Sequence, residues 1–477
     1  MSRLPFGSCL PLLLAGLVSC SSAEKATRPP APGVRAAPTV RVPDNGWTES
    51  KKAVHALNRL AFGPSPRDLD EVRRLGVAGW IQRQLDPGTL PDEAVAERLA
   101  DFRTLGMSVE ELEREYPPLR VQAERAGIDL KEEGARQLLR DRLDEDERPR
   151  RIGVELAAAK LVRAVESRRQ LQEVLTDFWF NHFNVSAEKG AVRWMVTSYE
   201  RDALRPYVFA TFRELLGATA RHPAMLFYLD NWVSTRDDPA AARTRRGKGK
   251  AATGLNENYA RELLELHTLG VDGGYTQQDV REVARCFTGW SIEKPRAVGT
   301  FVFRKRAHDP GRKVVLGTVI PAGGGLEDGE RVLDLLAAHP STARFIARKL
   351  SRKFVSDDPP PELVERLADV FLRSGGSLPD VYSALFSSPE FWADGAYGAM
   401  TKKPFELATS AVRALGGTTD GSPALYRQIE RMGEALYRAQ PPTGYPESSE
   451  SWVNAGALVS RINFGIALAS NRVKGTR

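Results

Sequence analysis

Hydrophobic residues recur at helical spacing along most of this chain, and this periodicity constrains its fold more than any other feature. Between Trp47 and about Leu229, apolar residues repeat every three or four positions in successive stripes. Gly76 ends one stripe and Pro87 ends the next. Such spacing is typical of amphipathic helices whose apolar faces meet in a core. With 477 residues, the chain is long enough to bury a large one.

The period of the pattern changes after residue 290. Residues 300–304 and 313–317 resemble two short strands, and a Pro-Gly pair at 310–311 lies between them. Pro-Gly pairs favour turns, so these segments predict a small β-hairpin near residues 300–318. Helical spacing returns near Leu326. The predicted fold is therefore mainly α, a multi-helical globular body with one small β-hairpin.

The first 46 residues differ from the rest of the chain. Residues 10–18 are apolar but too few to cross a bilayer as a mature helix, which is typical of a signal peptide over residues 1–19. Leu-Val-Ser-Cys at 17–20 resembles a bacterial lipobox, which implies lipid attachment to Cys20; the alternative is an ordinary secretory signal with an incidental cysteine. Residues 20–46 are proline-rich and predict an extended tether, so the folded body would span 47–477.

Charge and cysteine content exclude several classes of protein. The net charge of +7 is a mild excess for this length, and no zinc-finger or RNA-binding motif is present, so we expect no nucleic-acid partner. No nucleophile elbow or phosphate-binding loop is present either. Cys286 would be the one cysteine left after signal cleavage and acylation, which excludes an internal disulfide. Residues 234–254 form a basic loop, either a surface insertion or a lid that attracts an anion.

A polar block occupies residues 256–270, with the sequence Asn-Glu-Asn-Tyr-Ala-Arg-Glu-Leu-Leu-Glu-Leu-His-Thr-Leu-Gly. A purely structural helix has little use for such polar density. On a regular helix, Leu263, Leu264 and His267 fall on one apolar stripe, while Glu262 faces away from it. That geometry argues against a metal site on one helix face. The polar side chains are then either solvated or they line a cleft that other helices complete.

Two further polar pairs are candidates for a site. Asn181 and His182 stand among aromatic residues, which predicts a histidine in a dry pocket where its pKa is tunable. The alternative is a helix end packed in an aromatic core. His308 and Asp309 occupy the predicted hairpin turn. Such a pair can bind a metal or relay a proton, or it can form a turn with an exposed histidine.

These blocks resemble, in order, the signature of the bacterial family called domain of unknown function 1800. The likeness covers roughly residues 50 to 470, and Tyr445 stands where the family usually has tryptophan. The family has no settled biochemistry, and the resemblance adds only that its members are often encoded beside a secreted, sulfatase-like family. The matching segments are 55–63, 256–270, 289–290, 308–309, 403–406, 440–446 and 452–454.

Together these features predict a cell-envelope lipoprotein, anchored to the bilayer through acylated Cys20, with the outer membrane favoured. Whether it is an enzyme stays open. One hypothesis is a hydrolase for an anionic or polysaccharide-like substrate, with a divalent metal compatible with the site but not required. The alternative is a non-catalytic lipoprotein that binds or scaffolds a secreted, sulfatase-like partner. In the first hypothesis the catalytic residues are His182, Glu257, Glu262 and His308. The substrate-binding residues are Asn181, Asn258, Arg261 and Asp309.

Overall fold

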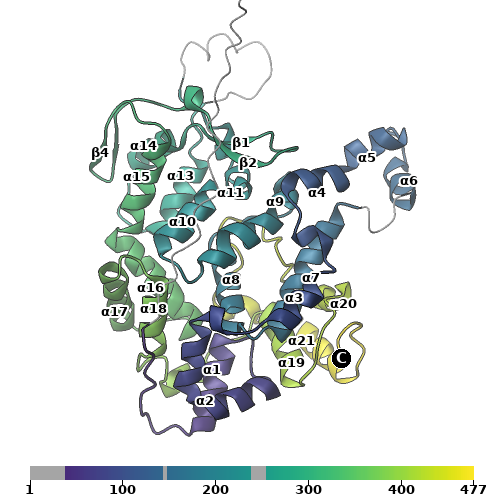
Figure 1. The fold of residues 1–477 in the computed structure, drawn as a ribbon, viewed down its shortest axis with the longest axis vertical. Coiled ribbons are helices and arrows are strands. Elements are labelled where there is room, and N and C mark those ends of the chain that lie inside the picture. The colour runs from purple at the N-terminus through teal and green to yellow at the C-terminus, as the bar shows by residue number, and fades with distance from the viewer. Residues whose placement is uncertain (1–37, 143–147, 238–253) are drawn as a thin grey trace, which may run out of the picture.

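The computed structural model describes residues 38–142, 148–237 and 254–477. The predicted signal peptide, Cys20, most of the tether and most of the basic loop lie outside the described residues. The described chain is mainly helical, with two small antiparallel sheets (Figure 1). The predicted fold class is therefore confirmed. No helix in the described ranges is long and apolar enough to cross a membrane.

The helices follow the apolar stripes of the sequence. The kink in the second helix lies at Gly76, whose φ of 71° is in the left-handed region that favours glycine. The helices of the first half are α1 (Glu49–Leu60), α2 (Pro66–Gln84), α3 (Glu93–Leu99), α4 (Val109–Glu115), α5 (Leu119–Ala126), α6 (Ala135–Arg142), α7 (Arg150–Glu166), α8 (Gln170–His182), α9 (Val192–Ser198), α10 (Phe212–Arg221) and α11 (Pro223–Tyr228).

The second half is also built from short helices, and proline opens several of them. They are α13 (Asn258–Glu262), α14 (Gln277–Phe287), α15 (Leu326–Ala337), α16 (Pro340–Phe354), α17 (Pro361–Arg373), α18 (Leu378–Phe386), α19 (Pro404–Ala414), α20 (Pro423–Arg431) and α21 (Ala455–Ala469). Two wider π-helical segments are η4 (Tyr199–Leu204) and η7 (Leu263–Thr268). Single 3₁₀ turns are η1 (Pro87–Thr89), η2 (Arg103–Leu105), η5 (Arg205–Tyr207), η6 (Asn231–Val233), η8 (Lys305–Ala307), η9 (Asp394–Ala396) and η10 (Ser449–Trp452).

The two predicted strands are present, but the predicted pairing between them is wrong, because each pairs with a strand that the sequence did not predict. Strand β2 (Thr300–Phe303) pairs with β1 (Trp290–Glu293), and β3 (Lys313–Val315) pairs with β4 (Thr318–Ile320). The tight turn is Leu316-Gly317, where both residues have positive φ, rather than the Pro-Gly pair at 310–311. Each predicted strand therefore closes on a neighbour of its own.

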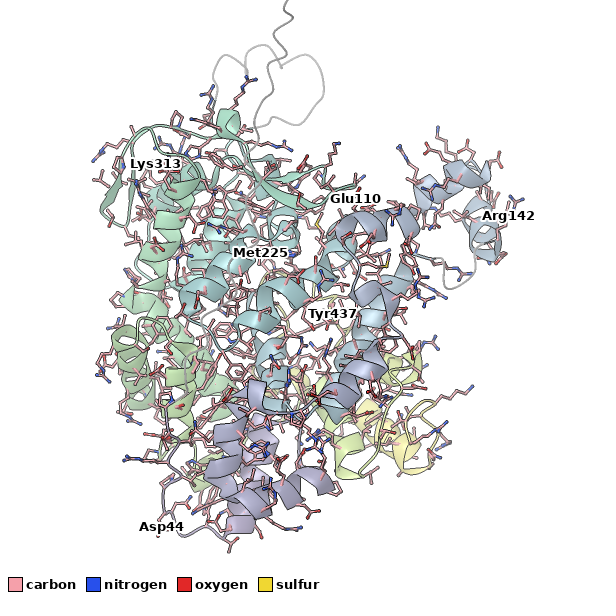
Figure 2. All side chains as sticks on the ribbon, viewed as in Figure 1. Asp44, Glu110, Arg142, Met225, Lys313 and Tyr437 are labelled. Atoms are coloured by element: carbon pink, nitrogen blue, oxygen red, sulfur yellow. The ribbon has the colours of Figure 1, made fainter. Side chains whose placement is uncertain are left out.

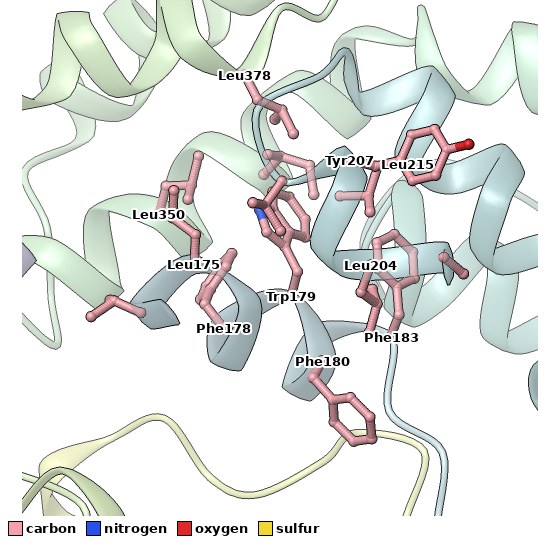
Figure 3. Close-up of a cluster of buried hydrophobic side chains, with 14 of the residues drawn as sticks. Leu175, Phe178, Trp179, Phe180, Phe183, Leu204, Tyr207, Leu215, Leu350 and Leu378 are labelled. Atoms are coloured by element: carbon pink, nitrogen blue, oxygen red, sulfur yellow. The ribbon is translucent and has the colours of Figure 1, made fainter. Parts of the chain in front are cut away.

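Helix α8 runs through the middle of the hydrophobic core. Trp179 is fully buried, and its Nε1 donates to the hydroxyl of Tyr382 at 2.8 Å. Figure 3 shows how Phe178, Trp179 and Phe183 of this helix meet leucines from other elements, Leu204 and Leu350 among them. The aromatic density at 178–183 thus builds core, and α8 becomes a rigid element from which a site can be positioned.

The two ends of the described chain meet in the same part of the molecule. Arg413 of α19 is fully buried and forms an ion pair with Asp68 of α2. Its guanidinium also donates to the carbonyl oxygens of Gly63 and Val165. Residues 38–46, which the sequence placed in the tether, pack on the body as well, since the carbonyl of Pro38 accepts a bond from Ser383 Oγ at 3.1 Å.

Candidate functional site

His182 lies at the end of α8 inside the aromatic core. Its Nε2 is 3.1 Å from the carbonyl oxygen of His267, and its ring contacts Phe183 and Phe345. Burial, assisted by the positive charge of Lys349, holds the pKa of His182 well below its ordinary value. The ring is therefore neutral, and its Nδ1 has no partner among the described residues.

The acidic start of the polar block makes contacts mainly with its own surroundings. Arg261 donates to Gln277 at 2.7 Å and lies 3.6 Å from Glu257. Asn258 Nδ2 donates to the carbonyl of Leu229 at 3.3 Å. Burial, followed by repulsion from a neighbouring glutamate, raises the pKa of Glu262. These side chains are partly exposed to solvent, and their hydrogen bonds and ion pair hold neighbouring segments of the chain together.

His308 and Asp309 lie in a third, separate region of the molecule, beside β3. His308 is buried, with Nδ1 2.8 Å from the carbonyl of Thr288 and Nε2 3.2 Å from Asp328. Lys313 binds the same Asp328 carboxylate at 2.7 Å, and both of their side chains are fully buried. Asp309 forms an ion pair with Arg285 of α14 at 2.7 Å. The pair thus fastens the sheet region to α14 and α15 rather than standing in an exposed turn.

The structure does not bring these groups together. Among the described residues, no hydrogen bond, ion pair or ring contact joins His182 to Glu262, or either of them to His308. Figure 2 shows Lys313, the neighbour of His308, near the upper end of the body and Tyr437 in its middle. Of the predicted site residues, Asn181 lies in a different setting, a polar cleft near Tyr437.

Three adjoining hollows form this cleft. The first and third share Lys403, the first and second share Glu447, and the second and third share Tyr445. We call the combined hollow the Lys403 cleft. The volumes of its parts are about 220, 380 and 30 Å³. The second hollow alone is large enough for a small ligand.

The walls of the Lys403 cleft come from segments far apart in the sequence. Helices α1, α8 and α16 line it together with residues 397–406 and 434–448. Two ion pairs hold these walls together: Lys353 binds Glu406 at 2.5 Å, and Lys160 binds Asp177 at 2.5 Å. Lys402 Nζ donates to Asn58 of α1 at 2.9 Å, which joins the chain ahead of α19 to the first helix.

Three lysines of the cleft, Lys349, Lys402 and Lys403, form no ion pair among the described residues, although Lys402 donates to the neutral side chains of Asn58 and Ser410. Lys403 is 9% exposed, yet no carboxylate of the described residues lies within ion-pair distance of its ammonium group. Lys349 likewise forms no ion pair within the described ranges, and burial lowers its pKa. The nearby Glu447 is affected by both, because their positive charges outweigh burial and lower its pKa. These ammonium groups can therefore receive an anionic group of a ligand.

A pair of carboxylates with opposite proton affinities lies beside Lys403. Burial, followed by the negative charge of Asp177, raises the pKa of Glu434 to about 7. Burial alone would raise the pKa of Asp177 too, but Lys160 and Lys353 outweigh it and lower that pKa. Glu434 can therefore hold or release a proton near neutral pH, as a general acid or base must.

Asn181 fixes the segment that closes the cleft. Its Nδ2 donates to the carbonyl of Tyr445 at 2.9 Å and to Glu447 at 3.1 Å, and its Oδ1 accepts from the Tyr445 amide at 2.8 Å. Gly444 has a φ of 70°, and a Cβ there would lie 2.5 Å from the carbonyl oxygen of Asn181. Glycine is required at this close approach, so α8 and residues 440–447 form one unit.

Tyr445 is held in place by two hydrogen bonds to one residue of the chain. Its hydroxyl donates to the carbonyl of Ala435 and accepts from the amide of the same residue, both at 2.9 Å. An indole can only donate and could not make both bonds. Its ring still contacts Trp452 at a centroid distance of 6.0 Å.

The sequence contained a signal for the Lys403 cleft that residue chemistry alone did not reveal. Three segments that resemble the family line it, namely 55–63, 403–406 and 440–446. Because they lie hundreds of residues apart, their meeting point was visible only in the fold. No group of three or more histidine, cysteine, aspartate or glutamate residues within the described ranges could hold a metal ion.

Comparison with known proteins agrees with this pattern of segments. The model of a family described as "Protein of unknown function (DUF1800)" matches residues 55–476, nearly the whole chain. No curated protein and no solved structure matches the chain. The matched range begins at His55 of the cleft wall and includes every residue of the cleft. The chain therefore belongs to the family of domain of unknown function 1800.

Proposed function

We propose that this protein is a cell-envelope lipoprotein that hydrolyses an anionic, polysaccharide-like substrate in the Lys403 cleft. The observation that carries the proposal is the buried ammonium group of Lys403 together with the half-buried one of Lys349, neither of which forms an ion pair with a described residue. Cationic side chains outnumber carboxylates in the lining of the cleft. A carboxylate, sulfate or phosphate group of a substrate would supply the direct contact that the surrounding carboxylates do not make.

Glu434 is the residue we assign to proton transfer. When ionised, it would take a proton from a water molecule whose oxygen attacks the scissile centre, and it would then deliver that proton to the departing oxygen. Asp177 supports this role through its charge, which favours the protonated form of Glu434. The main-chain N–H of Phe405 donates to the Glu434 carboxylate at 2.8 Å and orients it.

The second candidate is a non-catalytic lipoprotein that holds an acidic group of a secreted partner. The closed ion pairs Lys160–Asp177 and Lys353–Glu406 favour it, because they hold the walls of the cleft together and leave Lys349, Lys402 and Lys403 as cations that can bind an acidic group. This candidate predicts binding of an acidic ligand without turnover, so one set of variants separates the two.

The experiment measures binding and hydrolysis of sulfated and carboxylated polysaccharides by the full chain. Lys403→Met should abolish binding, Lys403→Arg should retain part of it, and Lys305→Met at an exposed lysine should change nothing. Glu434→Gln should retain binding and lower turnover about 100-fold or more. Binding without turnover in the parent would favour the second candidate. Binding that Lys403→Met leaves unchanged would refute the assignment of the cleft.

A further inference from the structure

The outer face of α21 has a composition that the cleft does not explain. This helix carries a single charged residue, Arg461, whose Nη1 donates to the carbonyl of Lys402 at 2.9 Å and is thus directed to the body. The remaining outward positions carry no charge, whereas the exposed face of an ordinary surface helix is polar. Its large apolar side chains, each between 51% and 58% exposed, are Leu458, Val459, Ile462 and Ile466.

The helix is nevertheless firmly attached. Phe464, on the inward side, is 2% exposed and inserts into the core, and α21 packs on α19. Val453, just before the helix, is 62% exposed and extends the apolar face. Contiguous exposed apolar surface of this kind marks a site of interaction rather than a random scatter of hydrophobic residues.

Cations accompany the apolar face. Residues 451–477 contain no aspartate or glutamate. Arg472, Lys474 and Arg477 follow the helix, are exposed, and form no ion pair with any described residue. Asp420 lies beside Gly475 and offsets one of these charges. The apolar face and its cationic end together match a surface that is apolar beneath an anionic layer.

We propose that this face of α21 lies in the plane of an anionic lipid surface. Fifteen residues extend about 22 Å, less than the roughly 30 Å of a hydrocarbon core, so the helix suits the interface and not a span. Leu458, Ile462 and Ile466 would enter the boundary of the acyl chains, and the cations would meet phosphate headgroups. A second copy docked through the same face would present the same cations, because residues 451–477 contain no aspartate or glutamate to complement them.

Membrane docking through α21 does not depend on the chemistry of the Lys403 cleft, but it would determine where the cleft lies relative to the membrane. Arg461 joins α21 to Lys402, which lines the first hollow. Trp452 of η10, which precedes α21, donates to the carbonyl of Pro446 in the second hollow. Docking through α21 would therefore hold the Lys403 cleft beside the membrane surface.

The test is sedimentation with vesicles of phosphatidylcholine, with and without phosphatidylglycerol. The full chain carries Cys20→Ser in every sample, so acylation contributes nothing and the leader contributes equally. One variant combines L458S, I462S and I466S, and a second combines R472Q, K474Q and R477Q. The matched control combines V271S and V319S, which replace exposed apolar residues outside α21. Strand β4, which contains Val319, lies at the opposite end of the molecule from α21 (Figure 1). Circular dichroism checks that each variant is folded.

We expect binding that requires phosphatidylglycerol. Both α21 variants should weaken it about tenfold or more, and the control should not. Equal binding by the apolar variant would overturn the proposal, as would equal binding to vesicles without phosphatidylglycerol. A concentration-dependent dimer in light scattering that the apolar variant abolishes, without vesicle binding, would also overturn it and assign the face to a second copy.

Discussion

Replacing Glu434 with glutamine should stabilise the folded protein above neutral pH. Glu434 is 5% exposed, and burial with repulsion from Asp177 raises its pKa from 4.5 to about 7. Between these two pH values the folded chain holds a proton that the unfolded chain has released. The free energy of unfolding therefore falls as pH rises through this window. A change of that size corresponds to about 3 kcal/mol.

Glutamine removes this loss because its side chain is neutral at every pH and its amide oxygen still accepts from Phe405. The Glu434→Gln variant and its parent should have similar unfolding free energies near pH 4.5. The variant should be about 3 kcal/mol more stable at pH 8.5.

Urea unfolding followed by circular dichroism from pH 4.5 to 8.5 measures the difference. Glu97→Gln, at an exposed glutamate of α3, is the control and should shift nothing. A difference between the Glu434→Gln variant and its parent that stays constant across this range would refute the reasoning. So would a variant that is the less stable of the two at pH 8.5. A stabilised variant that loses turnover is the behaviour expected of a strained functional group.

Two further substitutions test how the cleft is supported. Arg413→Met should lower the unfolding free energy measured in urea by about 3 kcal/mol, because the buried Asp68 then keeps only the partly exposed Arg67 as its cation. Arg67→Met should lower it less, because Arg413 stays in place. Gly444→Ala should lower the unfolding free energy by more than about 1 kcal/mol and weaken ligand binding, because the new Cβ would meet the main chain of α8. Gly127 has a similar φ but open space around it, so Gly127→Ala is the control. An equal or larger loss of stability in Gly127→Ala would contradict the role of the contact at Gly444.

Helices were predictable from the sequence because their apolar spacing is local. The kink of α2 at Gly76 and the position of α1 both follow from residues within a few turns. Strand pairing was not predictable, because it depends on which segments meet. The left-handed turn at Leu316-Gly317 was the available signal for the second pair, and leucine disguised it, since asparagine or glycine is usual there.

The polar block departs from a regular α-helix, although its buried stripe was predicted correctly. The helix widens from Leu263 onward. There the amide of Leu269 donates to the carbonyl oxygen of Leu264, and the hydroxyl of Thr268 donates to the carbonyl oxygen of Leu263. The predicted apolar stripe is confirmed, since Leu263, Leu264 and His267 are buried. The partners of Arg261 came from α14, which no pattern within the block could reveal.

The buried charge of Lys403 supports the proposal that the cleft binds a ligand. An ammonium group taken out of water costs several kcal/mol unless a counterion is in direct contact. A structural lysine would be expected to find such contact, as Lys353 does with Glu406 at 2.5 Å. Lys403 instead interacts at longer range with several surrounding carboxylates, one of which, Glu434, has a pKa raised to about 7. Apolar residues of similar volume are often as stable as buried ionic groups, so a charge at Lys403 favours the proposed role in binding an anion.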